Sequence, residues 1–319
     1  MIRLERVKAT GFIVGKDFEF SILNPTRLVL VDDGLNFSPN TIIVTTIRDI
    51  IDFIYGNYRG NTISFDKTEK EITFDFLYKG NKLRYYFNYE GTFLFVTQVF
   101  LNGENVYSVD NYNHKVYQGS AFNNYIQKFK PFLSNDISGV LTWEVLIWDR
   151  LGRKLFNSIY FPKLDQRCVY DVSSKQIKDK TWKIYQTLIK KLDLGIDRVN
   201  ICRKYNTTLS EVYDIDYFSN GHQFYLNSLG SGVKRLDSVL PFLIDSVVGD
   251  RICMFDYDAF MNLHPCIIGA FIKLYKKFNM RGQVIMPWYH DCIDEISESD
   301  LYKTHSEYPR NLIVEYKQK

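Results

Sequence analysis

A run of four apolar residues, Leu28-Val29-Leu30-Val31, constrains the fold of this 319-residue chain more than any other feature. A continuous apolar run is typical of a strand that is buried on both faces, as in parallel sheets covered by helices. The run leads into a polar turn at residues 32–40. The sequence therefore predicts an α/β protein whose sheet includes this strand.

The segment after the turn is predicted to be a helix. Its apolar residues recur at helical spacing, at Ile43, Ile47, Ile50 and Ile54. Gly56 follows at the position of a helix C-cap. The β-branched cluster at residues 42–47 favours a strand by propensity alone. Because the helical period continues for about three turns, we give it more weight.

Residues 62–107 have a different period. Apolar and aromatic residues alternate with other residues at Ile72, Phe74, Phe76, Tyr78, Leu83, Tyr85, Phe87 and Tyr89. Lys79-Gly80-Asn81 and Asn102-Gly103 are typical of tight turns. This pattern predicts an antiparallel, aromatic-faced meander. Residues 2–22 are predicted to form two short strands around Gly11 and Gly15.

The second half of the chain returns to alternating helices and strands. Helical stripes are predicted within residues 182–192, 233–247 and 265–278, and short buried strands at residues 252–255 and 284–286. Together with the meander, this pattern predicts an α/β core with a segregated antiparallel lobe.

Composition excludes several classes of protein. The five cysteines are scattered, odd in number and never spaced as CxxC, so we expect reduced thiols and no disulfide frame or zinc site. The N-terminus has no apolar segment typical of a signal peptide, and no stretch approaches about 18 uninterrupted apolar residues. We therefore expect a cytoplasmic protein without a membrane span. The net charge of +3 permits contact with nucleic acid without requiring it.

The turn after the first buried strand has the layout of a phosphate-binding loop. A helix N-terminus presents unpaired N–H groups and a positive dipole end to an anion. The eight residues Gly34–Thr41 align without a gap on GxxxxGK[ST]. Gly34 and Thr41 match, whereas Pro39 and Asn40 replace the second glycine and the lysine. The same composition is also typical of an ordinary loop.

Four later segments resemble the RecF/SMC-like class of ABC-type ATPases. Residues 229–236 (LGSGVKRL) are similar to its signature segment, and residues 252–256 (ICMFD) to its Walker B strand. Leu263-His264-Pro265 is similar to the LHP that follows Walker B in this class. Residues 283–286 with His290-Asp291 resemble its last strand and switch histidine. Residues 188–201 are similar to small AAA-type ATPases of bacterial phage defence.

This resemblance implies an ABC-ATPase-like P-loop fold with a mixed core sheet, flanking helices and an antiparallel β-lobe. It implies one domain over residues 1–319, with the β-lobe at 57–120 and a mostly helical segment at 121–225. Residues 226–319 would then hold the signature and Walker B half. ATP and Mg²⁺ are the cofactors that it implies.

The resemblance also assigns roles to individual residues. They are Gly34, Asn36, Asn40 and Thr41 for nucleotide, Thr41 and Asp256 for Mg²⁺, Asp256, Asp258 and His290 for catalysis, and Ser231, Gly232, Lys234 and Arg235 for a signature acting on a partner's nucleotide. Each group also has a simpler interpretation. Asp256 and Asp258 are compatible with an ordinary turn, and Ser231-Gly232 with a helix N-cap.

Departures from the family pattern in two motifs, the phosphate-binding loop and the Walker B segment, predict that hydrolysis is lost. Asn40 is neutral and short, so it cannot replace the lysine that neutralises the β- and γ-phosphates. Pro39 has no N–H to donate. Tyr257 follows Asp256 where the family has a glutamate that orients the attacking water, and Asp258 is the nearest candidate to replace it.

Three hypotheses remain open from the sequence. The first is a pseudo-ATPase that serves as a regulatory or scaffold subunit, in a homodimer or with an ATPase-type subunit or effector protein, and completes that partner's ATP site. The second is a weakly active homodimer that binds and hydrolyses ATP. The third is an interaction module whose aromatic lobe binds protein or nucleic acid, although aromatic residues at a period of two more often form core and cross-strand pairs.

Overall fold

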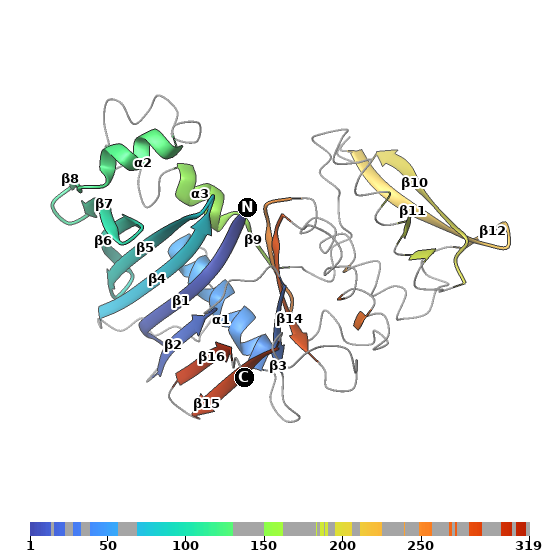
Figure 1. The fold of residues 1–319 in the computed structure, drawn as a ribbon, viewed down its shortest axis with the longest axis horizontal. Helices are drawn as coiled ribbons and strands as arrows, with labels where there is room; N and C mark the ends of the chain where they lie inside the picture. Colours follow the sequence, from blue (N-terminus) through green and yellow to red (C-terminus); the bar gives the residue numbers. More distant parts are fainter. Residues whose placement is uncertain are drawn as a thin grey trace.

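The computed structural model describes the chain in segments. These are residues 1–13, 16–22, 28–32, 39–56, 69–129, 150–161, 183, 186–187, 189–190, 195–205, 211–224, 239, 249–256, 268–269, 272, 281–288, 301–307 and 311–316. Within them the strands form two large sheets and one small sheet, with helices packed between and beside them (Figure 1). The predicted combination of an α/β core with an antiparallel sheet is confirmed.

The larger sheet is antiparallel and has the order β2-β1-β4-β5-β6-β7-β8. Its strands are β1 (Ile2–Ile13), β2 (Lys16–Ser21), β4 (Glu69–Tyr78), β5 (Asn81–Glu90), β6 (Phe93–Leu101), β7 (Glu104–Asp110) and β8 (Lys115–Gln118). The predicted meander is confirmed in β4 to β7. The sheet also includes β1 and β2, because β1 pairs with β4 along most of its length.

Two of the predicted turns have the backbone that their residues favour. Lys79 and Gly80 join β4 to β5 with φ values of 50° and 75°, and Asn102 and Gly103 join β6 to β7 with 52° and 91°. A positive φ at both central residues is the type I′ arrangement, whose twist matches that of the flanking strands. This geometry sets the register in which Ile72 pairs with Phe87.

The second sheet is mixed and has the order β16-β15-β3-β14-β13-β9. Its strands are β3 (Leu28–Asp32), β9 (Ile159–Tyr160), β13 (Ile252–Met254), β14 (Gln283–Trp288), β15 (Leu301–Glu307) and β16 (Asn311–Tyr316). All neighbouring pairs are parallel except β15 and β16. The predicted strands at residues 28–31, 252–255 and 284–286 are confirmed.

Helix α1 (Pro39–Ile54) follows β3, as the helical period predicted. Its apolar stripe is buried, and Ile43, Ile47 and Ile50 are fully inaccessible to solvent. The helix ends at Ile54, and Gly56 after it has a φ of 70° and donates its N–H to the carbonyl of Phe53. The period of 3.6 therefore outweighed the β propensity of residues 42–47 because this stripe could be buried against the sheets.

Two short helices and a third sheet complete the described residues. The helices are α2 (Phe122–Phe129) and α3 (Arg150–Phe156). The third sheet consists of β10 (Arg198–Tyr205), β11 (Glu211–Ser219) and β12 (His222–Phe224), all antiparallel. These strands lie in the segment that the sequence described as mostly helical. None of the helices in the described part of the chain is long and apolar enough to cross a membrane.

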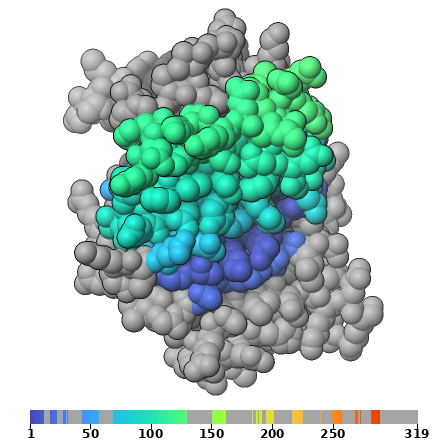
Figure 2. Space-filling model, turned by 90° about the vertical axis from the view of Figure 1, so that its left-hand side faces the viewer, coloured from blue at the N-terminus to red at the C-terminus, as the bar shows by residue number. Residues whose placement is uncertain are grey.

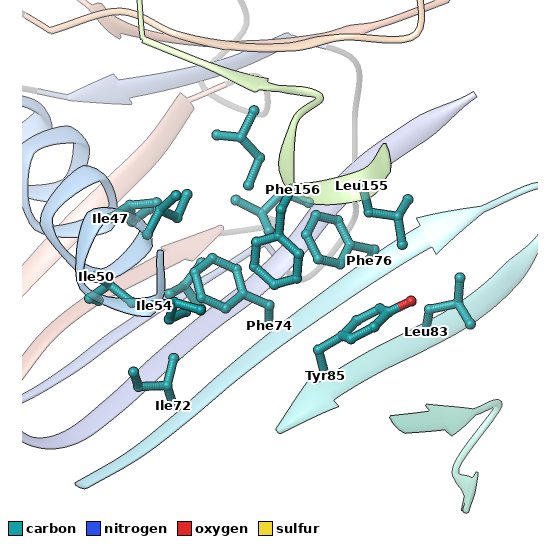
Figure 3. Close-up of a cluster of buried hydrophobic side chains, with 14 of the residues drawn as sticks. Ile47, Ile50, Ile54, Ile72, Phe74, Phe76, Leu83, Tyr85, Leu155 and Phe156 are labelled. Carbon is teal, nitrogen blue, oxygen red and sulfur yellow. The ribbon is translucent and has the colours of Figure 1, made fainter. Parts of the chain in front are cut away.

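Phe156 of α3 occupies the centre of the aromatic core. Its ring centroid lies 4.9, 5.3, 5.7 and 6.1 Å from those of Phe74, Phe76, Tyr85 and Phe87. Figure 3 shows Phe156 pointing from α3 toward Phe74 and Phe76 of β4, with the isoleucines of α1 nearby. Just after α3, the carbonyl of Ser158 accepts a hydrogen bond from the N–H of Ile252 in β13. The aromatic core therefore connects the two large sheets.

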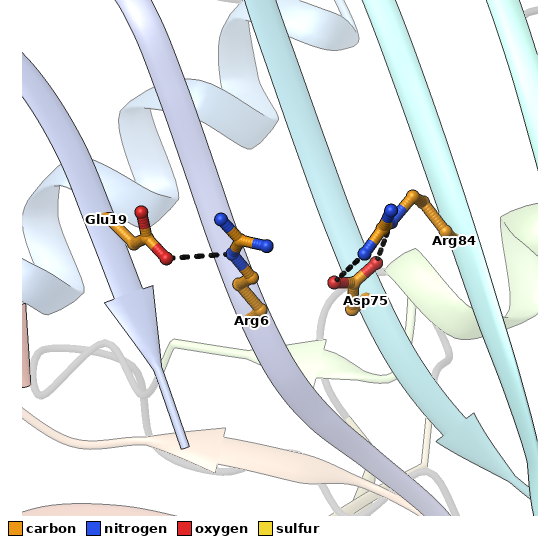
Figure 4. A network of polar contacts seen from close by, with 4 residues as sticks. All are labelled: Arg6, Glu19, Asp75 and Arg84. Carbon is orange, nitrogen blue, oxygen red and sulfur yellow. Dashed lines mark hydrogen bonds and ion pairs between the residues drawn. The ribbon is translucent and has the colours of Figure 1, made fainter. Parts of the chain in front are cut away.

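The other face of the antiparallel sheet carries polar residues that pair across strands (Figure 4). Arg6 pairs with Glu19 at 2.9 Å, and Arg84 binds Asp75 through two contacts of 2.7 and 3.0 Å. The hydroxyl of Tyr86 donates to Glu71 at 2.7 Å, and burial together with this bond raises the pKa of Tyr86 to about 12. In Figure 2 the strands and α2 form one continuous face, from blue at β1 to green at α2.

A buried hydroxyl in this sheet leads to a first prediction. Thr97 of β6 is fully buried beside Phe87 and Val109, and its Oγ1 has no hydrogen-bond partner among the described residues. Because an unsatisfied buried polar atom costs about 1–3 kcal/mol, Thr97→Val should raise the free energy of unfolding by roughly 1 kcal/mol in urea. Thr73→Val, at a half-buried position of β4, is the control and should change it little. A less stable Thr97→Val variant would contradict this prediction.

The side-chain amide of Gln283 forms hydrogen bonds between the two large sheets. Strand β2 pairs with β1 only from Arg6 onward, and the N–H of Ile22 bonds the carbonyl of Glu5. At Leu4, beyond the end of the pairing with β2, the side chain of Gln283 supplies the hydrogen bonds to β1 instead. The N–H of Leu4 donates to Oε1 at 2.8 Å, and Nε2 donates to the carbonyl of Leu4 at 3.2 Å. A side chain of β14 thereby continues the hydrogen bonding of β1.

Candidate functional site

The carboxyl ends of β3, β14 and β13 meet at one edge of the mixed sheet. Asp32, the last residue of β3, is paired with Trp288 of β14. On the other side of β14, the N–H of Phe255 donates to the carbonyl of Ile285 at 2.9 Å. Asp256 comes next in the chain and is partly buried. In open α/β sheets ligands bind at this edge, so Asp256 lies where a site is expected.

Helix α1 begins near the same edge. Residues 33–38 connect Asp32 to Pro39, the first residue of the helix, and Figure 1 places one end of α1 beside β3. The N–H groups of a first helical turn have no partner within the helix, and the dipole adds positive potential there. The arrangement of strand, turn and helix therefore suits an anion.

Proline at the first helical position also has a simple local cause. Its ring fixes φ near the helical value, and the N–H that it lacks would have no partner within the helix. For phosphate binding the same substitution removes one donor. Pro39 thus stabilises the start of α1 and supplies no N–H to an anion at that end of the helix.

The structure places some of the predicted site residues and leaves others untested. The backbones of Asn40 and Thr41 lie in the first turn of α1, and Asp256 follows β13 at the same edge. The other predicted residues lie outside the described part of the chain; they are Gly34, Asn36, Ser231, Gly232, Lys234, Arg235, Asp258 and His290. The partial site therefore consists of the start of α1 and Asp256.

These residues fit Mg²⁺ and ATP only in part. The first turn of α1 can donate backbone N–H groups, and a carboxylate such as Asp256 is a ligand that Mg²⁺ prefers. The charge for the β- and γ-phosphates is missing from α1, whose first basic residue is Arg48, more than two turns from its start. We therefore derive no hydrolytic step from this site.

Sequence reasoning missed two features of the mixed sheet, one at this edge and one at the opposite end of β14. Asp32 was taken as a turn residue, yet it is the last residue of β3 and level with Trp288. Gln283 was taken only as the start of an apolar strand, yet its side chain is fully buried. In both cases the available signal was a polar residue directly next to a buried apolar run. The partner of each residue depends on strand order, which the sequence pattern did not provide.

Comparisons with known proteins bear on the fold. No protein-family model matches the chain, and no curated protein matches its sequence. Among solved structures, an SMC head bound to the C-terminal winged-helix domain of ScpA has a TM-score of 0.52 at 11% identity, covering 96% of this chain and 94% of that one. The SMC head domain from Thermotoga maritima has a TM-score of 0.50 at 13% identity and covers 95% of each chain.

A structure of RecF with ATP is also similar over 93% of this chain and 94% of that one, at 12% identity and a TM-score of 0.38. The assignment of the fold rests on the two SMC heads. The chain therefore has a mixed α/β fold that resembles that of SMC head domains. At identities of 11% and 13%, the structural similarity shows the fold alone.

Proposed function

We propose that this chain is a degenerate ABC-type ATPase head that has lost hydrolysis and acts as a regulatory or scaffold subunit. One observation carries the proposal. The fold resembles SMC heads over nearly the whole chain, but helix α1 starts with Pro39-Asn40-Thr41 and has no lysine in its first turns. A head of this kind keeps the shape of the nucleotide site without its main phosphate-binding charge.

The size of the loss supports this proposal over a working ATPase. Removing one preorganised donor from a developing charge costs about 3–4 kcal/mol in the transition state. That is roughly a hundredfold or more in rate at 25 °C. Tyr257 in place of the expected glutamate is a second departure in the same site, and a phenol with an ordinary pKa near about 10 is a poor general base. Asp258 is the candidate that would compensate in an active homodimer.

The proposal extends to partners. Ser231, Gly232, Lys234 and Arg235 match the family signature better than Gly34–Thr41 match its phosphate-binding loop. We propose that these residues face the nucleotide of a second subunit, in a homodimer or with an ATPase-type subunit or effector protein. One of the similar SMC heads is bound to a partner protein, ScpA. A cytoplasmic role in phage defence is part of the same proposal.

A nucleotide titration tests the proposal. ATP and a non-hydrolysable analogue are titrated calorimetrically into the wild-type protein and into Asn40→Lys, Asp256→Ala and the control Asn113→Lys, with Mg²⁺ present. Asn40→Lys should tighten binding of the analogue about tenfold or more, because it restores a charged phosphate contact. Asn113→Lys adds the same charge at an exposed turn and should leave binding unchanged.

Phosphate release from the same samples separates the alternatives. The pseudo-ATPase proposal requires that purified wild-type protein releases no phosphate above background. Release that depends on Mg²⁺ and disappears in Asp256→Ala would contradict it and establish the active homodimer. If neither nucleotide binds even at millimolar concentration to the wild type or to Asn40→Lys, the chain is an interaction module that retained the fold.

A further inference from the structure

A group of lysines gathers at the end of the antiparallel sheet where β4 turns into β5. Lys79 lies in that turn, Lys128 in the last turn of α2 and Lys154 in α3. Figure 1 shows α2, α3 and the N-terminus together at this end of the molecule. Asp250 lies here too, just before β13, whereas Asp256 lies beyond the opposite end of that strand. The group is therefore separate from the candidate nucleotide site.

The three lysines converge on Tyr78 and its neighbours. The ammonium nitrogen of Lys154 lies 3.3 Å from the hydroxyl of Tyr78, and that of Lys79 lies 5.5 Å from the centroid of its ring. Lys128 donates to Oδ1 of Asn81 at 2.9 Å, and Nδ2 of the same side chain donates to the carbonyl of Lys79 at 3.1 Å. Tyr78 also stacks on Phe129 at the end of α2, with centroids 6.0 Å apart.

Among the residues that the structure describes, positive charge exceeds negative charge around these lysines. Asp250 is the carboxylate that interacts with both Lys154 and Tyr78, and its Oδ1 also pairs with the Met1 ammonium at 3.2 Å. Arg3 is a further cation next to Met1, and it interacts electrostatically with Glu5. The carbonyls at the end of α2 offset about half a charge at Lys128. Burial lowers the pKa of Lys154, Asp250 opposes that shift, and Lys79 lowers it further.

Two arginines of the neighbouring sheet face are instead paired with carboxylates. Arg6 and Arg84 are each neutralised by a carboxylate on the next strand. Lysine is a compact point charge with three rotatable donors, which suits the tetrahedral oxygens of phosphate and needs no planar match of the kind that arginine makes with carboxylate. Lys79 and Lys128 are exposed, so they are accessible to such a group.

We propose that Lys79, Lys128 and Lys154 form a binding site for a chain of phosphate groups, separate from the edge that holds Asp256. The amide of Asn81 positions Lys128, and Tyr78 positions Lys154. Tyr78 is buried and offers no surface on which a base could stack, so binding depends on phosphate charge. A free oligophosphate and a phosphodiester backbone share this chemistry. The site therefore gives the protein a second way to respond to phosphorylated ligands.

The test uses inorganic tripolyphosphate and a fluorescent single-stranded oligo(dT) as probes, with the full chain in low-salt buffer without Mg²⁺. The test variant is Lys79→Gln with Lys128→Gln. Both side chains are exposed, so folding should be retained and is checked by thermal unfolding. The control is Lys115→Gln with Lys190→Gln, which removes the same charge from two exposed lysines elsewhere.

We expect the test variant to bind about tenfold more weakly than the wild type and the control to stay within about twofold, because only the first removes local contacts. Lys79→Arg with Lys128→Arg should retain most of the binding. Competition between the two probes would indicate one shared phosphate site. If only one probe binds, with the same dependence on Lys79 and Lys128, its identity shows whether the ligand is a free oligophosphate or a phosphodiester backbone. Equal losses in the test and control variants, or no binding of either probe, would overturn the proposal.

Discussion

Replacing Phe156 with alanine is expected to lower the free energy of unfolding by about 3–5 kcal/mol, more than any other substitution considered for this protein. The side chain is 2% exposed and contacts four aromatic rings of β4 and β5 within 6.1 Å. Its removal leaves a cavity that neighbouring rings, held in two paired strands, cannot close. Edge-to-face ring pairs add roughly 0.5–1.5 kcal/mol to the loss.

Because of the position of α3, we expect Phe156→Ala to destabilise the mixed sheet as well as the aromatic core. Helix α3 runs directly into β9, the edge strand of the mixed sheet, and Ser158 bonds Ile252 of the next strand at 2.8 Å. Phe156 is therefore the residue through which the aromatic core supports that edge. We expect the whole chain to unfold at lower urea concentration, with no separate transition for the antiparallel sheet.

Urea unfolding followed by circular dichroism and by tryptophan fluorescence measures this effect. Phe93→Ala is the matched control, because Phe93 lies in the same sheet with 51% of its surface exposed and should cost less than about 1 kcal/mol. Phe156→Leu keeps most of the volume and should lose much less than alanine. If Phe156→Ala and Phe93→Ala had equal effects, the role assigned to Phe156 would be wrong.

The sequence predicted the elements that are set by local pattern. The apolar run at residues 28–31, the isoleucine stripe of α1 and the alternating segment at residues 72–89 all formed as expected. In the helix and in the alternating segment one period repeats for several residues, and cap or turn residues stand where expected, at Gly56 and at Lys79-Gly80. Local and long-range preferences agree in these segments, so a single sequence is sufficient to identify them.

The order of the strands in the sheets could not be predicted from the pattern of apolar residues. Strand β1 joins the meander by pairing with β4, and β15 lies parallel to β3 although about 270 residues separate them. Side chains at a period of two show which face is buried and leave the identity of the neighbouring strand open. Strand β10 was missed because Arg203 interrupts its apolar alternation, whereas the alternation at Tyr213, Ile215 and Tyr217 of β11 was present and was not recognised.

For the candidate site too, the local elements could be predicted from the sequence and their arrangement in space could not. The strand, turn and helix at residues 28–54 could be predicted, and so could a carboxylate after the strand at residues 252–254. Their meeting at one edge depends on β14 lying between β3 and β13, which is a property of the sheet order. The lysines around Tyr78 come from a turn and two short helices, so no spacing in the sequence connects them.

The second large effect is expected for Gln283, whose side chain bonds β1 of the antiparallel sheet to β14 of the mixed sheet. Its amide satisfies both the N–H and the carbonyl of Leu4, at a place where β2 no longer pairs with β1. Gln283→Met keeps the length and most of the volume but bonds neither group. Two buried backbone groups would then lack partners, at a cost of about 1–3 kcal/mol each, so we expect a loss of roughly 2–4 kcal/mol in urea unfolding.

Gln118→Met is the control, because Gln118 is exposed on β8 and should lose less than about 0.5 kcal/mol. Gln283→Glu tests the hydrogen bonds directly. When neutral, its carboxyl can still donate to the carbonyl of Leu4 and accept from the N–H. Burial raises the pKa of such a group in the folded state above its unfolded value near about 4.3, so stability relative to the wild type should fall as pH rises through that range and above it. A Gln283→Met variant as stable as the wild type, or a Gln283→Glu variant without this pH dependence, would show that the sheets are held together elsewhere.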